Sequence, residues 1–164
     1  MSTVKKEEWP MLQLSTLTAR NFIGIANRCA GMAMMSEELI GRFGGYLCIA
    51  DMDTGIPLLT VVIGNPTSEK GTKYKQLAEE KCARLAKHRG HVSSWQTRDV
   101  DSNQFGGAVR TSRRILGFSG FPEHWDEALC VAVAVEVGEM SDKLATEILW
   151  ASQNDVRRVM KMRK

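Results

Sequence analysis

The sequence predicts a single domain of the α+β class, in which antiparallel hairpins are combined with amphipathic helices. Two β-rich runs, at residues 46–51 and 56–63, flank the turn signal Met52-Asp53-Thr54-Gly55. A second pair of β-rich runs, at residues 105–111 and 114–119, predicts another hairpin. Apolar residues at helical spacing before, between and after these hairpins predict the helices of the domain.

Local signals indicate where the helices begin and end. Ser15 can cap a first helix, and a second follows the break at residues 64–67 and runs to about Arg89. Pro122 with acidic residues after it predicts the start of a third helix. The valines of that segment nevertheless alternate in the manner of a strand: Val131, Val133, Val135 and Val137. Ser141 caps a last amphipathic helix, at residues 141–161.

Length and composition set the class of protein. The 164 residues are 43% apolar and 25% charged, which is ordinary for one globular domain with a real core. A net charge of +3 does not favour nucleic acid as a partner. Charged residues near the N-terminus predict that there is no signal peptide, and the longest apolar run, at 128–135, is too short for a membrane span. We therefore expect a cytoplasmic protein.

Cysteine spacing argues against a zinc site and against a disulfide framework. The four cysteines have no CxxC or CxH spacing, which predicts buried free thiols: Cys29, Cys48, Cys82 and Cys130. Asp51 and Asp53 are explained more simply by an Asx-type turn than by a metal ion. No metal site is predicted.

Three polar residues around the second helix are candidates for ligand binding. Lys81 lies at the edge of the apolar stripe of that helix, and His88 follows on the same side seven residues later. Lys81 either extends along the rim of the core or meets an anionic ligand. His91 forms an H-x-x-H pair with His88, although such a pair is more often solvated or hydrogen-bonded than metal-binding.

The second hairpin contributes the remaining candidates. Gly106 and Gly107 mark either a bulge with a close backbone approach or a flat surface for a ligand. Arg110, like the two arginines at residues 113–114, can pair with carboxylates through its planar guanidinium. The alternative is a solvated hairpin tip. Neither a nucleophile elbow nor a phosphate-binding loop is present in the sequence.

Several of these residues also match a known family. A Ser-Gly-x-Pro-x-x-x-Asp-Glu pattern occurs at Ser119, Gly120, Pro122, Asp126 and Glu127. With the Gly106-Gly107 pair and a partial match over residues 81–86, the chain resembles the family of GlcG, HbpS and the PduO C-terminal domain, catalogued as haem-binding or haem-degrading. The similarity covers about residues 14–137, so the helix at 141–161 is an addition. Arg110 and Thr111 depart from the proline and aliphatic residue usual in the family.

The resemblance carries expectations for the fold and for assembly. It implies a two-layer sandwich in which helices pack on one face of an antiparallel sheet, similar to profilin and PAS-like domains, and it favours a helix after Pro122. It also implies a homo-oligomer, for which Trp150 and Met160 on the added helix are plausible contact residues; the alternative is that this helix packs on its own domain.

A ligand site follows from the resemblance in the same way. It implies that the helix with Lys81 and His88 packs against the glycine strand. Haem or another anionic planar ligand would then lie on Gly106 and Gly107. Lys81 or Arg110 would hold its carboxylate, with His88 or His91 near a metal centre.

The sequence leaves three functional hypotheses. The leading one is a non-enzymatic, oligomeric module that binds a small ligand. The second is an enzyme that acts on haem or on a small organic acid. The third is a scaffold subunit that binds protein partners.

Overall fold

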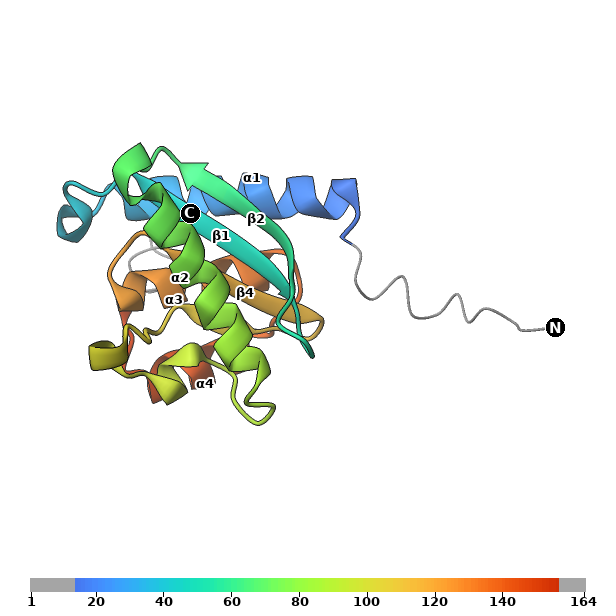
Figure 1. Cartoon of the computed structure of the whole chain (residues 1–164). Coiled ribbons are helices and arrows are strands. Elements are labelled where there is room, and N and C mark those ends of the chain that lie inside the picture. The colour runs from blue at the N-terminus through green and yellow to red at the C-terminus, as the bar shows by residue number, and fades with distance from the viewer. Residues whose placement is uncertain (1–13, 157–164) are drawn as a thin grey trace.

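The computed structural model describes residues 14–156 and places helices on both faces of a four-stranded antiparallel sheet (Figure 1). The strands are β1 (Gly44–Asp51), β2 (Pro57–Gly64), β3 (Ala108–Arg110) and β4 (Arg114–Ser119). The helices are α1 (Thr16–Ala33), α2 (Ser68–Ala86), α3 (Glu123–Glu136) and α4 (Asp142–Ala151). Both predicted hairpins are present, and the α+β class is confirmed.

The sheet has the order β2-β1-β4-β3, so β1 and β4 join the two hairpins at its centre. The first hairpin turns as predicted, because the Asp51 carboxylate accepts hydrogen bonds from the Thr54 amide at 2.8 Å and from its hydroxyl. Gly55 completes this turn with a φ of 73°. The third strand is shorter than predicted and begins only after Gly107, whose φ of 125° is incompatible with a regular strand.

The helices cover both faces of the sheet, so the expectation that they would pack on one face is wrong. Strand β1 alternates between two cores: Leu47 and Ile49 join α1 and α3 on one face, whereas Cys48 and Ala50 join α2 on the other. Because all four side chains are buried, each face of the central strand needs a cover. The molecule has three layers, with α2 alone on its side of the sheet (Figure 1).

Helix α3 lies in the larger core, and its structure settles whether this segment forms a helix or a strand. Its alternating valines belong to a helix buried on nearly every side, between the sheet, α1 and α4. Pro122 is its N-cap, and the acidic Glu123 and Asp126 lie in the first turn, where the helix dipole favours negative charge.

Helix α4 begins as predicted but ends earlier. The Ser141 hydroxyl accepts a hydrogen bond from the Leu144 amide at 3.1 Å, as expected for an N-cap. The helix stops at Ala151 instead of continuing to residue 161, because Ser152 turns inward and donates a hydrogen bond to Glu127. Its apolar face packs on its own domain, and Trp150 is 84% exposed. Residues 157–164, including Met160, lie outside the described part of the chain.

The four cysteines are buried and unpaired, which confirms their prediction as free thiols. Burial raises the pKa of Cys82 and of Cys130 well above the ordinary thiol value. None of the helices within residues 14–156 is long and apolar enough to cross a membrane.

Candidate functional site

The two glycines predicted to carry a ligand are buried against protein side chains. A β-carbon at Gly106 would lie 2.6 Å from the indole ring of Trp95, and one at Gly107 would lie 2.7 Å from Nζ of Lys81. The missing side chains therefore allow an indole and an ammonium group to pack closely on the backbone. A planar ligand such as haem has no room at this place unless Trp95 and Lys81 move.

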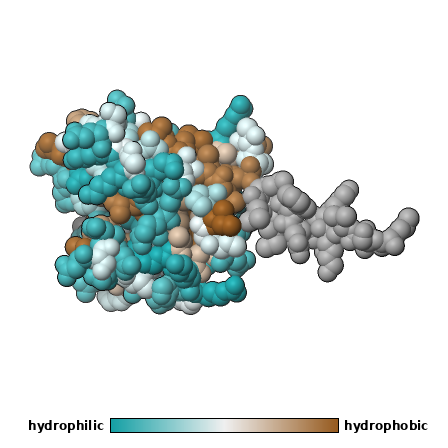
Figure 2. All heavy atoms as spheres, viewed as in Figure 1, coloured by the Kyte–Doolittle hydropathy of each residue, from teal (hydrophilic) through white to brown (hydrophobic). Residues whose placement is uncertain are grey.

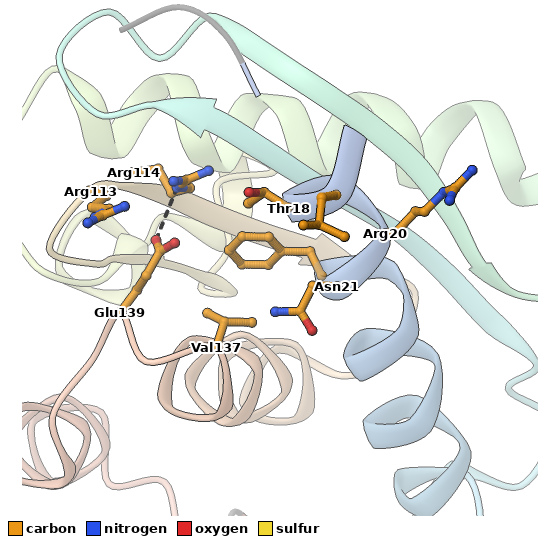
Figure 3. Close-up of a pocket in the computed structure, with 9 residues that line it drawn as sticks. Thr18, Arg20, Asn21, Arg113, Arg114, Val137 and Glu139 are labelled. Atoms are coloured by element: carbon orange, nitrogen blue, oxygen red, sulfur yellow. Dashed lines mark ion pairs between the residues drawn. The ribbon is translucent and has the colours of Figure 1, made fainter. Parts of the chain in front are cut away.

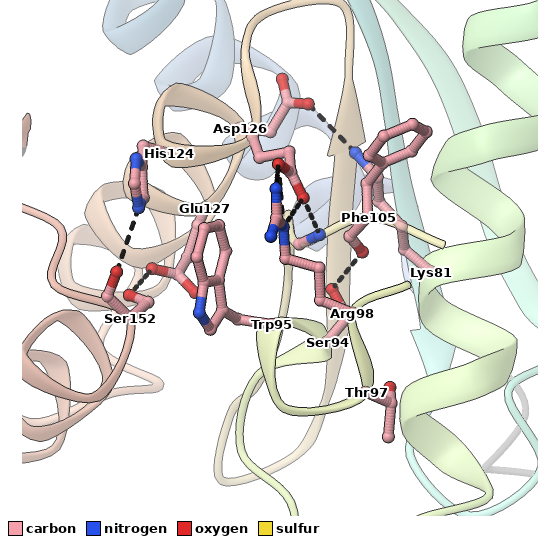
Figure 4. A network of polar contacts seen from close by, with 12 residues as sticks. Lys81, Ser94, Trp95, Thr97, Arg98, Phe105, His124, Asp126, Glu127 and Ser152 are labelled. Carbon is pink, nitrogen blue, oxygen red and sulfur yellow. Dashed lines mark hydrogen bonds and ion pairs between the residues drawn. The ribbon is translucent and has the colours of Figure 1, made fainter. Parts of the chain in front are cut away.

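Lys81 forms a buried ion pair and is only 1% exposed. Its Nζ donates to Oδ2 of Asp126 at 3.0 Å and to the carbonyl oxygen of Phe118 at 2.8 Å (Figure 4). The other oxygen of Asp126 accepts from the Phe121 amide at 2.9 Å. Lys81 thus neither extends along the rim of the core nor meets a separate anionic ligand, because its partner is a carboxylate of the same chain.

The pKa of Asp126 predicts how stability depends on pH. Burial raises this pKa from its ordinary value of 3.8 to about 7, although the Lys81 ammonium and the Phe121 amide favour the ionised form. Between pH 4 and 7 the folded protein holds a proton that the unfolded chain has released. The free energy of unfolding should therefore fall by up to about 4 kcal/mol as the pH rises through this range.

This prediction is checked by urea unfolding at several pH values between 4 and 8. The control is the double variant Lys81→Met/Asp126→Asn, which lacks both titratable groups and should lose this component of the pH dependence. Equal slopes for the wild type and the control would contradict the prediction.

Arg110, His88 and His91 come together at the C-terminal end of α2, about two helical turns from Lys81. The Arg110 guanidinium donates to the carbonyl oxygens of Leu85 at 2.8 Å, Met52 at 2.9 Å and His91 at 3.0 Å. It thereby joins the last turn of α2 to the β1–β2 turn and to the loop that follows the helix. The two imidazole rings stack with centroids 5.0 Å apart.

The predicted site residues therefore form two clusters with separate structural roles. Nδ1 of His88 lies 2.9 Å from the carbonyl oxygen of Arg84, whereas the buried Nδ1 of His91 has no hydrogen-bond partner among the described residues. Within residues 14–156, no three His, Cys, Asp or Glu side chains are grouped so as to hold a metal ion.

A polar network that the sequence did not reveal fixes the loop between α2 and β3 (Figure 4). The buried Glu127 carboxylate accepts hydrogen bonds from Ser93 in the loop and from Ser152 and Asn154 after α4. Glu123 forms a bidentate ion pair with Arg98 and also accepts from the Gly106 amide. Glu123 and Glu127, both on α3, thus tie the loop and the segment after α4 to this helix.

Trp95 completes this arrangement from the outer side. Its indole stacks on the His124 ring at 4.5 Å, and the Arg98 guanidinium lies 4.7 Å from its centroid. Because Trp95 also covers Gly106, the loop closes over the place where a ligand was expected. The indole contact with the glycine and the polar network together produce this closure, and no local signal in the sequence predicts it.

An open cleft with concentrated positive charge lies elsewhere, beside the N-terminal half of α1 (Figure 3). Its volume is about 670 Å³, and it is lined by Leu17, Thr18, Arg20, Asn21, Phe22, Arg113, Arg114, Val137 and Glu139. The β3–β4 turn supplies two arginines, α1 supplies the third, and the segment after α3 supplies the carboxylate.

The cleft is lined by three arginines and one carboxylate, and these groups differ in whether they already have a partner. Nε of Arg114 lies 3.0 Å from Oε1 of Glu139, which also accepts a hydrogen bond from Thr111 at 3.1 Å. The only carboxylate in the lining is therefore already engaged, whereas Arg20 and Arg113 are exposed. The Phe22 ring lies beneath, with the Arg114 guanidinium 5.4 Å from its centroid.

A second hollow, of about 860 Å³ beside the start of α2, has no charged side chain in its lining. The cleft at α1 is thus the better candidate for recognition of a charged molecule. The sequence indicated its two hairpin arginines as carboxylate partners; Arg20 also lines the cleft, but its side chain points away from them (Figure 3).

The fold and the cleft together describe an α+β protein with an open cleft lined by arginines. No protein-family model, curated protein or solved structure matches the chain. The function is therefore argued from the cleft itself.

Proposed function

We propose that this protein is a non-enzymatic binding module for a small organic anion, held in the cleft beside α1. The observation that carries the proposal is the pair of guanidinium groups of Arg113 and Arg114 beside one engaged carboxylate, with the Phe22 ring beneath (Figure 3). Guanidinium groups bind carboxylates and phosphates in bidentate geometry. Arg113 would take the acidic group, because Arg114 is already paired.

The apolar part of the lining selects among anions. Leu17 and Val137 offer surface to a flat or branched hydrocarbon body. A ligand with a carboxylate at one end and an apolar ring at the other fits this distribution. Since the cleft is open to solvent, screening by salt should weaken the charged part of the interaction.

The non-enzymatic assignment rests on the chemistry of the lining. A general base or nucleophile must be free to meet the substrate. Glu139 is the only carboxylate of the cleft, and both Arg114 and Thr111 hold it. The lining contains no histidine, cysteine or lysine.

Removal of the free arginine at the hairpin tip should weaken binding of such an anion. We expect Arg113→Ala to raise the Kd for an aromatic carboxylate, with benzoate as the probe, about tenfold, because it loses one charge-assisted contact. Isothermal titration calorimetry at low salt measures the change. Arg89→Ala is the matched control, since it removes an exposed arginine outside the cleft. Equal affinity for the wild type and Arg113→Ala would contradict the proposal.

Haem, which carries two propionates, belongs to the same class of anionic planar ligands and is tested in the same way. A shifted Soret band that saturates would show binding. Competition by benzoate together with sensitivity to Arg113→Ala would locate haem in the cleft. Sensitivity to His88→Ala or His91→Ala instead would favour the residues predicted around the glycine strand and would count against the cleft.

A further inference from the structure

One edge of the sheet carries backbone groups that no described residue pairs with. Within residues 14–156, strand β2 pairs only with β1, and the amide of Asn65 donates to the carbonyl oxygen of Phe43 at 2.7 Å just beyond its end. Antiparallel strands alternate between residues that bond to the neighbour and residues that point away. With the observed register, Thr60 and Val62 direct their N–H and C=O groups away from β1.

The opposite edge of the sheet, unlike the β2 edge, is protected against pairing with a further strand. Strand β3 has three residues and ends in the charged Arg110, whose amide donates to the carbonyl oxygen of Val92 at 2.9 Å. Ser93 also bridges to Val109, so the preceding loop covers this edge. Strand β2 has eight residues and no charged side chain, and its proline stands at the first position. Monomeric proteins usually protect an edge of this kind.

The surface around β2 is apolar. Figure 2 shows hydrophobic residues gathered along this strand on the visible face, and Val62 is 46% exposed. Side chains of this kind would be shielded from water if another strand and its covering helices were placed beside β2.

Helix α1 flanks the same edge with a glycine-bearing face. The outward amide of Gly64 donates to Oδ1 of Asn27 at 3.0 Å, which places this side of the helix next to the edge. Gly24 and Gly31 lie on the same helical face as Asn27, and a β-carbon at either would meet nothing within 4 Å. Each glycine costs a helix about 1 kcal/mol relative to alanine. Among the described residues of one copy, no contact requires them.

We propose that two copies of this chain pair through β2 about a two-fold axis, forming a continuous antiparallel sheet with the α1 helices side by side. An axis through Val61 would set Thr60 opposite the partner's Val62, and each free N–H would meet a free C=O. A second copy is the occupant that matches this edge in both hydrogen bonding and polarity, because a two-fold contact is self-complementary. The glycines would let the two helices approach closely. The proposal is independent of the anion cleft.

Sedimentation velocity tests the assembly. The wild type at about 50 μM should sediment as a dimer, at twice the 18.3 kDa of one chain. Val62→Lys should convert it to a monomer, because a charge at the seam opposes edge pairing. The matched control is Val100→Lys, since Val100 is 45% exposed and lies in the loop between α2 and β3. It should remain a dimer.

Hydrogen exchange of the wild type tests the location of the contact, even if Val62→Lys does not fold. The Thr60 and Val62 amides should be protected at high protein concentration and should exchange faster on dilution. A monomeric wild type would overturn the proposal. So would a dimer whose Thr60 and Val62 amides exchange freely. Protection that is independent of concentration and is lost when residues 1–13 are deleted would assign the edge to the chain's own N-terminal segment instead.

Discussion

Lys81→Met should lower the free energy of unfolding by about 3–5 kcal/mol at pH 8, because it leaves the Asp126 carboxylate buried without its cation. The carbonyl oxygen of Phe118 loses its hydrogen-bond donor in the same change. At pH 5 the loss should be smaller, since Asp126 is then protonated. Urea unfolding followed by circular dichroism measures both values.

The double variant Lys81→Met/Asp126→Asn is the control for this prediction. It removes both charges but keeps an oxygen at position 126 that can accept from the Phe121 amide. Most of the stability lost in Lys81→Met should return. A double variant as unstable as the single one would show that the ammonium is needed for its packing and not for its charge.

Gly45→Ala should destabilise the protein by about 3 kcal/mol or more. Gly45 lies where β1 meets the end of β4, and a β-carbon there would fall directly on the carbonyl oxygen of Ser119 and 2.9 Å from Cα of Gly120. Both contacts are with backbone, so no flexible side chain can move aside. The strands would have to separate at the centre of the sheet.

Gly71→Ala is the matched control, because it makes the same change where space exists. Its β-carbon would meet only the Tyr46 ring, at an ordinary contact distance of 3.7 Å. Alanine also favours the helix, so stability should stay unchanged or rise by up to about 1 kcal/mol. Similar losses for the two variants in thermal unfolding would contradict the steric explanation.

The hairpins and helices could be predicted from the sequence because their signals are local. Asp51 and Gly55 form the turn that their types suggest, and Ser141 caps the helix that follows it. The end of α4 could not be predicted in this way, since it depends on the buried Glu127 that draws Ser152 inward. The hydrogen bond from Ser152 to this carboxylate ends the helix, although the helical pattern of apolar residues in the sequence continues.

The site was harder to predict for the same reason. Lys81 was identified as unusual by its position at the edge of an apolar stripe, but its partner Asp126 is 45 residues away. The glycine pair correctly indicated a close approach to the backbone, yet whether a ligand or Trp95 approaches is decided by the fold of the loop. The residue types indicated which segments carry polar and charged groups, but tertiary packing determines which of these groups pair with each other.

The thin packing between α2 and the sheet limits how this fold can acquire new specificity. The sheet presents small side chains to the helix, and a β-carbon at Gly117 would lie 2.9 Å from the carbonyl oxygen of Ala78. Between α2 and the sheet there is consequently little space to gain by trimming large residues, whereas the opposite core holds bulky side chains such as Phe118 and Trp125. On the α2 side, variation in recognition falls on the rim of the molecule, at its hairpin tip, its long loop and its edge strand, where substitutions leave the helix–sheet contact untouched.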